Sequence, residues 1–260
     1  MVDIPLHDDP SRPAFKGRTL LERAIAVISF TPVSQLSVKG GELAAAFQEA
    51  IRRDYPLLED TIDTFLNVHV SEAGVRSDQE DRRKWLYRDI DRNWTVALTQ
   101  DSLSLEGNRA GYSSWPKFVE RLSMLVHALQ STIGPSHVQR LGVRYLNTAE
   151  VEGDEDPRRV CAPQLTSITG NSALTLSDLL WAFEASEGQL IMRSGVMPPN
   201  ASYDPSMFGP RDKKVWYLDI DVANSHMIEF DPKTIEEQLR KLASRLHAVY
   251  YWAMPNGEGE

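Results

Sequence analysis

A repeated order of predicted elements constrains this chain more than any other feature. From about residue 19 the hydrophobic pattern predicts a strand, a helix, a strand, a hairpin and a helix, and from His137 it predicts the same five elements again. A short sequence similarity accompanies the repeat, because residues 85–91 read WLYRDID and residues 216–221 read WYLDID. We interpret the two halves as copies of one structural unit.

The predicted domain organisation follows from this repeat. Neither half contains enough strands to bury its two helices well, so we expect the halves to join in one sheet. The expected fold class is α+β, in which internally duplicated strand-helix-strand-hairpin-helix units form one mainly antiparallel, twisted sheet with helices on one face. The expected boundaries are a single domain over 1–260, an N-terminal strap over 1–18, and pseudo-repeats over 19–136 and 137–254.

The individual elements are predicted from apolar spacing and from helix-ending residues. Helices are expected over about 41–54, 115–133, 176–185 and from Pro232 onwards, the last one capped by Asp231. The charged stretch 71–84 has no apolar periodicity, and we predict a solvent-exposed loop there. Prolines make 197–214 an irregular loop, and we predict a hairpin over 215–230.

Polar side chains recur at alternate positions of the predicted strands. Alternation places such residues on one face of a sheet, and a sheet covered by helices on one side leaves its other face open. We therefore name a candidate binding surface made of these residues: Tyr87, Asp89, Asp91, Arg140, Arg144, Tyr217, Asp219 and Asp221.

This polar surface has three interpretations. The first is cross-strand pairing of arginine with aspartate on a solvated face, which contributes about 0.2–1 kcal/mol a pair. The second is a concave surface that binds a peptide, protein or small ligand, with Arg140 and Arg144 contacting anions and the tyrosines supplying contact area. The third is a metal site built from four carboxylates, which are Asp89, Asp91, Asp219 and Asp221.

Catalytic signatures do not appear in the sequence. The common phosphate-binding, dinucleotide-binding, nucleophile-elbow and zinc-protease motifs are absent, and no two of the six histidines have the spacing of helical metal ligands. Cys161 follows two arginines that would lower the pKa of a reactive thiol, but a lone cysteine is more typical of a small core residue. We expect no catalytic residue, no metal site and no cofactor.

Charge and cysteine content limit the partners and the compartment. The net charge of −9 disfavours general binding to nucleic acid and to anionic membrane surfaces. No apolar run reaches the roughly 18 residues of a membrane span. One cysteine cannot form a disulfide within the chain, which favours a reducing compartment, so we expect a cytoplasmic protein.

Several segments resemble a known family. They are LERAIAVISF ending at Phe30, DYP at 54–56, the Trp85 hairpin, Tyr112-x-x-Trp115-x-x-Phe118 and LGVRYLN at 141–147. Over most of the first 150 residues the chain is similar to a sporadically distributed prokaryotic protein family of unknown function. The element order also resembles a duplicated TATA-binding-protein-like or helix-grip arrangement. The resemblance implies a fold and an accessory-type prokaryotic protein, and it implies no activity.

Three functional hypotheses remain. The leading one is a non-enzymatic binding or adaptor protein that recognises a protein or peptide partner through the polar sheet face. The alternative is a small-ligand-binding protein with a cavity between sheet and helices. The second alternative is an enzyme of unknown reaction that uses Arg144 with aspartate or histidine partners.

Overall fold

The computed structural model describes residues 4–11, 20–37, 41–71, 74–151, 156–169, 171 and 173–255, with the side chains of residue 37 and of 63–82 outside the described part. Its strands are β1 (Leu21–Phe30), β2 (Leu57–Ser71), β3 (Gly74–Arg88), β4 (Trp94–Leu98), β5 (Ser102–Asn108), β6 (His137–Glu150), β7 (Ser177–Ala185), β8 (Gly188–Met197), β9 (Val215–Asn224) and β10 (Ile228–Glu229). Its helices are the 3-10 turn η1 (Ser34–Ser37), α1 (Glu42–Ile51), α2 (Trp115–Thr132), α3 (Pro157–Val160), α4 (Pro163–Thr166) and α5 (Pro232–Ala253).

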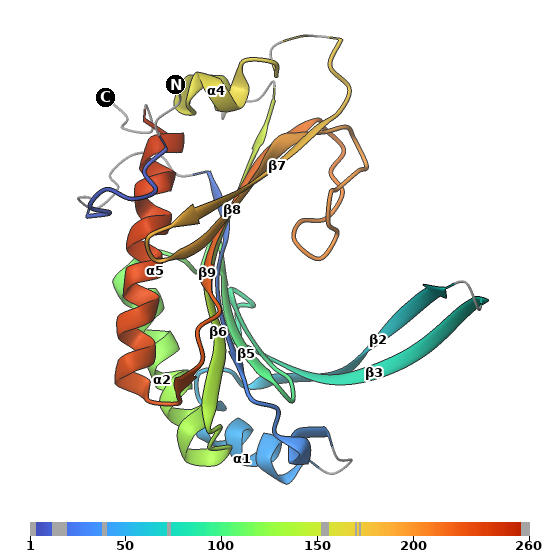
Figure 1. Cartoon of the computed structure of the whole chain (residues 1–260), viewed down its shortest axis with the longest axis vertical. Helices are drawn as coiled ribbons and strands as arrows, with labels where there is room; N and C mark the ends of the chain where they lie inside the picture. The colour runs from blue at the N-terminus through green and yellow to red at the C-terminus, as the bar shows by residue number, and fades with distance from the viewer. Residues whose placement is uncertain are drawn as a thin grey trace. The chain divides into compact units, whose positions relative to one another are not determined.

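The described strands form one sheet, so the chain belongs to the α+β class (Figure 1). The strand order is β2-β3-β4-β5-β1-β6-β9-β8-β7, and β10 pairs with β6. Each neighbouring pair whose register is known runs antiparallel. The predicted class and the mainly antiparallel sheet are therefore confirmed.

The chain divides into two compact units. Unit 1 contains Met1–Ile25, Leu141–Ser225 and Glu237–Glu260, and unit 2 contains 26–140 and 226–236. The division passes through β1 and β6, so each of these strands contributes to both units.

Unit 2 contains α1 and α2, and their predicted apolar faces are buried. Phe47 and Ile51 of α1 and Phe118 and Leu122 of α2 have almost no exposed surface. Helix α2 ends where expected, because the amides of residues 133 and 134 both donate to the carbonyl of Leu129. The predicted limits of both helices agree with the structure to within a few residues.

The loop predicted over 71–84 is wrong. Strands β2 and β3 pair continuously from Leu57 opposite Arg88 to Ser71 opposite Gly74, and they form the long two-stranded ribbon in Figure 1. Strand β3 reaches its other neighbour, β4, only over Trp85–Arg88. Antiparallel pairing satisfies the backbone whatever the side chains are, so a charged segment without apolar alternation can still form a strand.

Unit 1 contains β6, β9, β8 and β7, with the second part of α5 on one face of these strands. The Tyr145 hydroxyl on β6 hydrogen-bonds with His247 Nε2 at 2.9 Å, and the ring of Tyr145 makes an edge contact with Tyr250. Because successive side chains of a strand point to opposite faces, Arg144 and Leu146 lie on the face away from α5.

A loop covers part of that second face. Residues 198–214 form the irregular loop that was predicted. Met207 and Phe208 of the loop pack against Leu146, Val215 and Tyr217 in a buried cluster. The second face is therefore partly closed within unit 1, where an open surface was expected.

Two further predictions in unit 1 are wrong. Residues 177–185 form strand β7, where a helix over 176–185 was expected. The leucines that suggested helical spacing are half or more exposed, so no buried stripe selects a helix, and a nine-residue ladder with β8 satisfies the backbone. The hairpin over 215–230 does not form either, because β9 pairs with β6 and β8 while β10 pairs separately with the start of β6.

The predicted cap of the last helix is confirmed. Asp231 Oδ2 accepts hydrogen bonds from the backbone amide of Thr234 at 2.9 Å and from its hydroxyl at 2.7 Å. These contacts satisfy an amide that has no partner inside the helix. Pro232 is the first residue of α5, where its fixed backbone angle favours helix initiation.

Candidate functional site

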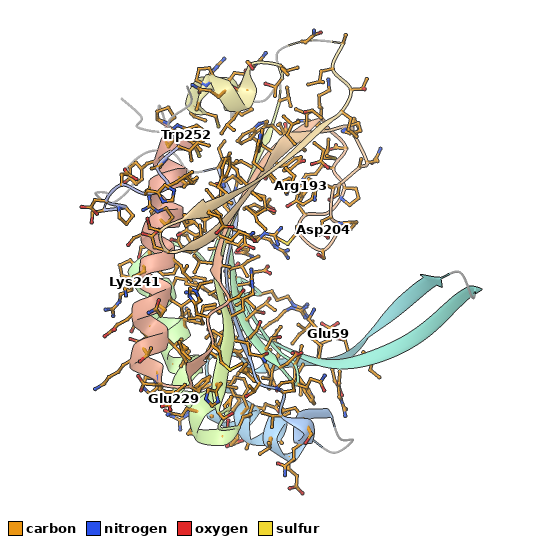
Figure 2. The ribbon with its side chains drawn as sticks, viewed as in Figure 1. Glu59, Arg193, Asp204, Glu229, Lys241 and Trp252 are labelled. Atoms are coloured by element: carbon orange, nitrogen blue, oxygen red, sulfur yellow. The ribbon has the colours of Figure 1, made fainter. Side chains whose placement is uncertain are left out.

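The candidate site is the polar face of unit 1, on the side of the strands away from α5. It consists of one residue from β6, one from β7, one from β8, one from the 198–214 loop and two from β9: Arg144, Asp178, Arg193, Tyr203, Tyr217 and Asp219. Figure 2 labels Arg193 on β8 and Asp204 on the loop, and both lie away from α5.

Two arginine–aspartate pairs form the centre of this polar face. Arg144 donates from Nε to Asp219 Oδ1 at 2.7 Å and from Nη2 to Oδ2. Arg193 makes the same two-pronged contact with Asp178, with Nε at 2.7 Å from Oδ1. The planar guanidinium matches the two oxygens of a carboxylate, so each pair is held in one orientation.

Two tyrosines complete the network. Tyr203 donates to Asp219 Oδ2 at 2.7 Å, and Tyr217 donates to Asp178 Oδ1 at 2.6 Å. The two rings stack with centroids 4.5 Å apart, and the guanidinium of Arg193 lies 4.3 Å from the centre of the Tyr203 ring. The Tyr203 side chain thus attaches the loop to two strands, β8 and β9.

The protonation states suit a structural or recognition role. Burial, and then the carboxylate of Asp219, raise the pKa of Tyr203 above its ordinary value. Burial and the hydrogen bond to Asp178 do the same for the pKa of Tyr217. The hydrogen bond from Arg193 lowers the pKa of Asp178. At neutral pH the tyrosines are therefore hydrogen-bond donors and Asp178 is an anion, and neither tyrosine can act as a base.

Arg144, which the enzyme hypothesis names, belongs to this network, whereas His247 and Cys161 do not join it. His247 lies on α5, which covers the opposite face, and burial lowers its pKa to about 4, so it is neutral at pH 7. Cys161 is buried, and burial raises the pKa of its thiol to about 12. The interpretation of Cys161 as a core residue is confirmed, because a buried protonated thiol is a poor nucleophile.

The structure places the predicted surface residues in two groups. Arg144, Tyr217, Asp219 and Asp221 belong to unit 1, where Asp221 is the direct cross-strand partner of Arg144. The predicted cross-strand pairing of arginine with aspartate is confirmed for Arg144 and Asp219.

The other four predicted residues belong to unit 2. Tyr87 does not lie on an open polar face: it is buried beneath α1, and its hydroxyl donates to the carbonyl of Ala44 at 3.4 Å. Strand β3 ends at Arg88, so Asp89 and Asp91 occupy the following turn, and alternation no longer determines where they point. Asp89 accepts from the backbone amide of Trp94 at 2.9 Å, and Arg140 lies on β6.

Three residues of the network were not predicted. Asp178 lies in a segment that was predicted to be a helix, so strand alternation could not be used to place its side chain on the polar face. Arg193 lies on β8 opposite Asp219 of β9, and only the order of the strands in the sheet shows that these two residues are neighbours. Tyr203 lies in an irregular loop, where no periodicity indicates a direction.

The polar face ends at an open edge. Among the described strands, β7 is the last in the order and pairs with β8 alone. Leu179 is 50% exposed and Leu180 is 65% exposed, although the two point to opposite faces of the strand. A leucine is therefore exposed on each face of this edge, although Trp181 and Phe183, on the same face as Leu179, are half-buried.

Neither a metal site nor a membrane helix occurs in the described part of the chain. No group of three or more histidine, cysteine, aspartate or glutamate side chains is arranged there to hold a metal ion. Among the described helices, none combines the length and apolarity that crossing a bilayer requires.

The fold and the site define an α+β protein with a large antiparallel sheet and a self-paired polar face on one unit. No protein-family model matches the chain, and no curated protein matches it.

Proposed function

We propose that this chain is a non-enzymatic binding protein that recognises an extended segment of a protein or peptide partner at the β7 edge of unit 1, beside the polar face. The observation that carries the proposal is the exposure of Leu179 and Leu180 on opposite sides of an edge strand. An extended segment added to such an edge gains main-chain hydrogen bonds, and its alternate side chains contact the two faces.

The composition of β7 supports this use of the edge. Proteins commonly protect a sheet edge with lysine, proline or a bulge. Strand β7 reads SDLLWAFEA, which contains no lysine and no proline. Its two charges are Asp178, which Arg193 neutralises, and the exposed Glu184.

The polar face keeps this edge in place. A Cβ atom on Gly195 of β8 would lie 2.0 Å from the Ser177 carbonyl oxygen, so only glycine permits the observed approach of β7 to β8. Asp178 is held by both Arg193 and Tyr217. An edge that is ordered before binding loses less conformational freedom when a partner adds to it.

Charge indicates the chemistry of the partner. The chain carries a net charge of −9, and Glu184 is exposed on the edge itself. A segment with apolar residues at alternate positions and a lysine or arginine near Glu184 fits these features, whereas nucleic acid does not. The proposal places this binding in the cytoplasm, as the single cysteine favours.

We also propose that the sheet consists of two related halves with helices on one face. The strand order supports this relation, because β1 neighbours β5 and β6 neighbours β9, so the first strand of each half pairs with the last long strand of that half. The chain of each half then reaches a long helix, α2 or α5.

An array of short synthetic peptides tests the binding proposal. It compares sequences that alternate apolar and polar residues, with and without one lysine, against scrambled peptides of the same composition. We expect the alternating, lysine-containing peptides to bind, and we expect bound peptide to slow amide hydrogen exchange along β7. Leu180→Lys should weaken binding at least about tenfold, since a lysine at an edge opposes strand addition.

Ile90→Lys is the matched control, because it replaces another exposed aliphatic side chain, in the turn after β3 of unit 2. Its peptide affinity should equal that of the parent chain. Scrambled peptides that bind equally well, an array without binders, or protection away from β7 would each contradict the proposal. Sedimentation showing a dimer that Leu180→Lys dissociates would assign the edge to a second copy and would also contradict it.

A further inference from the structure

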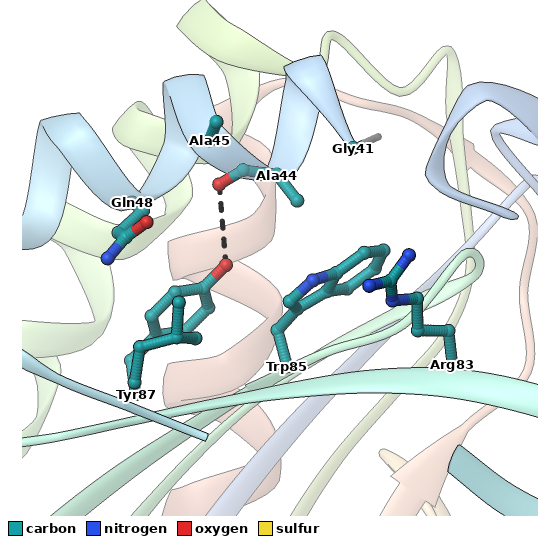
Figure 3. Close-up of a pocket in the computed structure, with 8 residues that line it drawn as sticks. Gly41, Ala44, Ala45, Gln48, Arg83, Trp85 and Tyr87 are labelled. Atoms are coloured by element: carbon teal, nitrogen blue, oxygen red, sulfur yellow. Dashed lines mark hydrogen bonds between the residues drawn. The ribbon is translucent and has the colours of Figure 1, made fainter. Parts of the chain in front are cut away.

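A cavity lies in unit 2 between α1 and the strands β2 and β3. Its volume is about 180 Å³ (Figure 3). The helix contributes Ala44, Ala45 and Gln48, the residue before it is Gly41, and the strands contribute Leu58, Arg83, Trp85 and Tyr87. In Figure 3 the rings of Trp85 and Tyr87 lie on the strand side, facing α1.

The aromatic wall of this cavity is formed in advance. Tyr87 is held by its hydrogen bond to the Ala44 carbonyl and by an edge contact with Phe47, at a centroid distance of 5.7 Å. Trp85 is 5% exposed, so packing restricts its ring. Gly41 has a φ of 51°, a backbone conformation that glycine adopts without strain, and a Cβ there would lie 3.6 Å from the Trp85 ring.

Arg83 supplies a hydrogen-bond donor at the cavity. Its Nε and Nη2 atoms bind Asp60, and its guanidinium lies 5.4 Å from the centre of the Trp85 ring. Within the part of the chain that the structure describes, Nη1 makes no hydrogen bond. The side-chain amide of Gln48, which is half-buried, is a second polar group in the lining.

We propose that this cavity binds a monocyclic aromatic compound whose substituent is an oxygen acceptor. An apolar cavity of about 150 Å³ takes up benzene, so the volume here suits one six-membered ring. The ring packs against Trp85 and Tyr87 in an offset or edge arrangement, and the acceptor receives a hydrogen bond from Arg83 Nη1. A cationic substituent is excluded, because it would lie beside the guanidinium.

This site is independent of the function proposed for β7, because its lining residues all belong to unit 2. It is a small-molecule site, whereas the β7 edge recognises an extended chain. Failure of one proposal therefore leaves the other intact.

The test uses benzamide, toluene and benzylamine as probes with the full chain. Binding is measured by chemical-shift titration of the backbone amides and of the indole N–H groups, with Trp85→Phe assigning the Trp85 signal. Benzamide should shift the signals of Trp85 and Ala45, and it should bind at least about tenfold more tightly than benzylamine, which is a cation at neutral pH. Arg83→Met, which has no side-chain N–H to donate, should remove the preference for benzamide over toluene.

Ala45→Leu fills the cavity from an exposed helix position, and leucine is a good helix former, so the fold is retained. It should weaken benzamide binding at least about tenfold. Ala46→Leu is the matched control, since Ala46 is an exposed neighbour outside the lining, and its affinity should be unchanged. Absence of a benzamide-induced shift at Trp85, or equal affinity of the two leucine variants, would overturn the site. A preference for benzamide that survives Arg83→Met would overturn the assigned donor.

Discussion

Asp178 is the residue that couples the candidate site to pH. Arg193 lowers the pKa of its carboxyl group in the folded chain, and Tyr217 adds a second hydrogen bond. Because the folded-state pKa lies below the unfolded value, this carboxylate stabilises the fold at pH values above about 4. The contribution is lost as the pH falls from about 4 through the lower folded-state pKa.

Asp178→Asn should therefore reduce the free energy of unfolding at neutral pH, by about 1 kcal/mol or less for a pair that remains partly exposed. It should also make the loss of stability on acidification shallower. Urea unfolding at several pH values between about 7 and 3 measures both effects. Arg193→Gln should likewise make the free energy of unfolding fall less steeply at acidic pH. If this fall is unchanged in both variants, the pair does not stabilise the fold.

At the scale of elements, the close approach of β7 and β8 at Gly195 decides whether the edge strand stays ordered. Gly195→Ala would bring a Cβ atom to 2.0 Å from the Ser177 carbonyl oxygen and to 3.0 Å from the Tyr217 hydroxyl. To avoid these close contacts, β7 or the side chain of Tyr217 must shift. We expect a loss of about 1–3 kcal/mol of stability, as for other overpacked positions.

Amide hydrogen exchange locates this effect, with faster exchange along β7 as the expected result. The control is Gly209→Ala, because a Cβ at Gly209 has no neighbour within 4 Å. Its stability should stay within about 0.5 kcal/mol of the parent chain. Equal behaviour of the two alanine variants would contradict the role assigned to Gly195.

At the scale of the whole molecule, segments from the two ends of the sequence meet at Arg245 of α5 in unit 1. Its side chain is 0% exposed and binds Glu187 through Nε at 2.6 Å and Asp8 through Nη1 at 2.9 Å. The carbonyls of Pro5 and Asp8 accept two further hydrogen bonds. The described part of the N-terminal strap is thus attached to α5 by one guanidinium.

Arg245→Met should cost about 3–5 kcal/mol, because it leaves the largely buried carboxylate of Glu187 without its partner. Urea unfolding measures the loss, and proteolysis near residues 4–11 should become faster. Lys241→Met is the control, one turn earlier on the exposed side of α5 (Figure 2). A variant at Arg245 as stable as the one at Lys241 would show that the strap is held by other contacts.

Local signals predicted the helices that carry a buried stripe and a cap. The apolar positions of α1, α2 and α5 and the cap at Asp231 lie close together in the sequence, and burial of one helix face makes their spacing regular. Period-two alternation likewise placed Arg144, Tyr217 and Asp219 on the candidate polar surface, and cross-strand pairing of arginine with aspartate was expected there, although the sequence did not specify which arginine pairs with which aspartate.

The predictions were wrong where burial does not give the apolar residues a regular spacing along the sequence. Leu176, Leu179 and Leu180, at or just before the start of strand β7, are half or more exposed, so burial does not impose a strand pattern on them, and their spacing suggested a helix. The charged arm β2–β3 is a two-stranded ribbon over much of its length and is maintained by backbone pairing. Tyr87 alternates correctly, but the face it occupies is the one that α1 covers.

The sequence by itself determined the α+β class, the amphipathic helices and the alternation that gathers arginine, tyrosine and aspartate on one side of a strand. Tertiary structure alone decided that β7 lies at an edge, that Tyr203 reaches back from its loop to Asp219, and that a cavity remains beneath α1. The physical reason is the distance along the chain between the residues that interact. Helical and strand periodicity arises from neighbours a few residues apart, whereas strand order, loop docking and cavities depend on contacts between segments whose separation along the chain leaves no periodic signal.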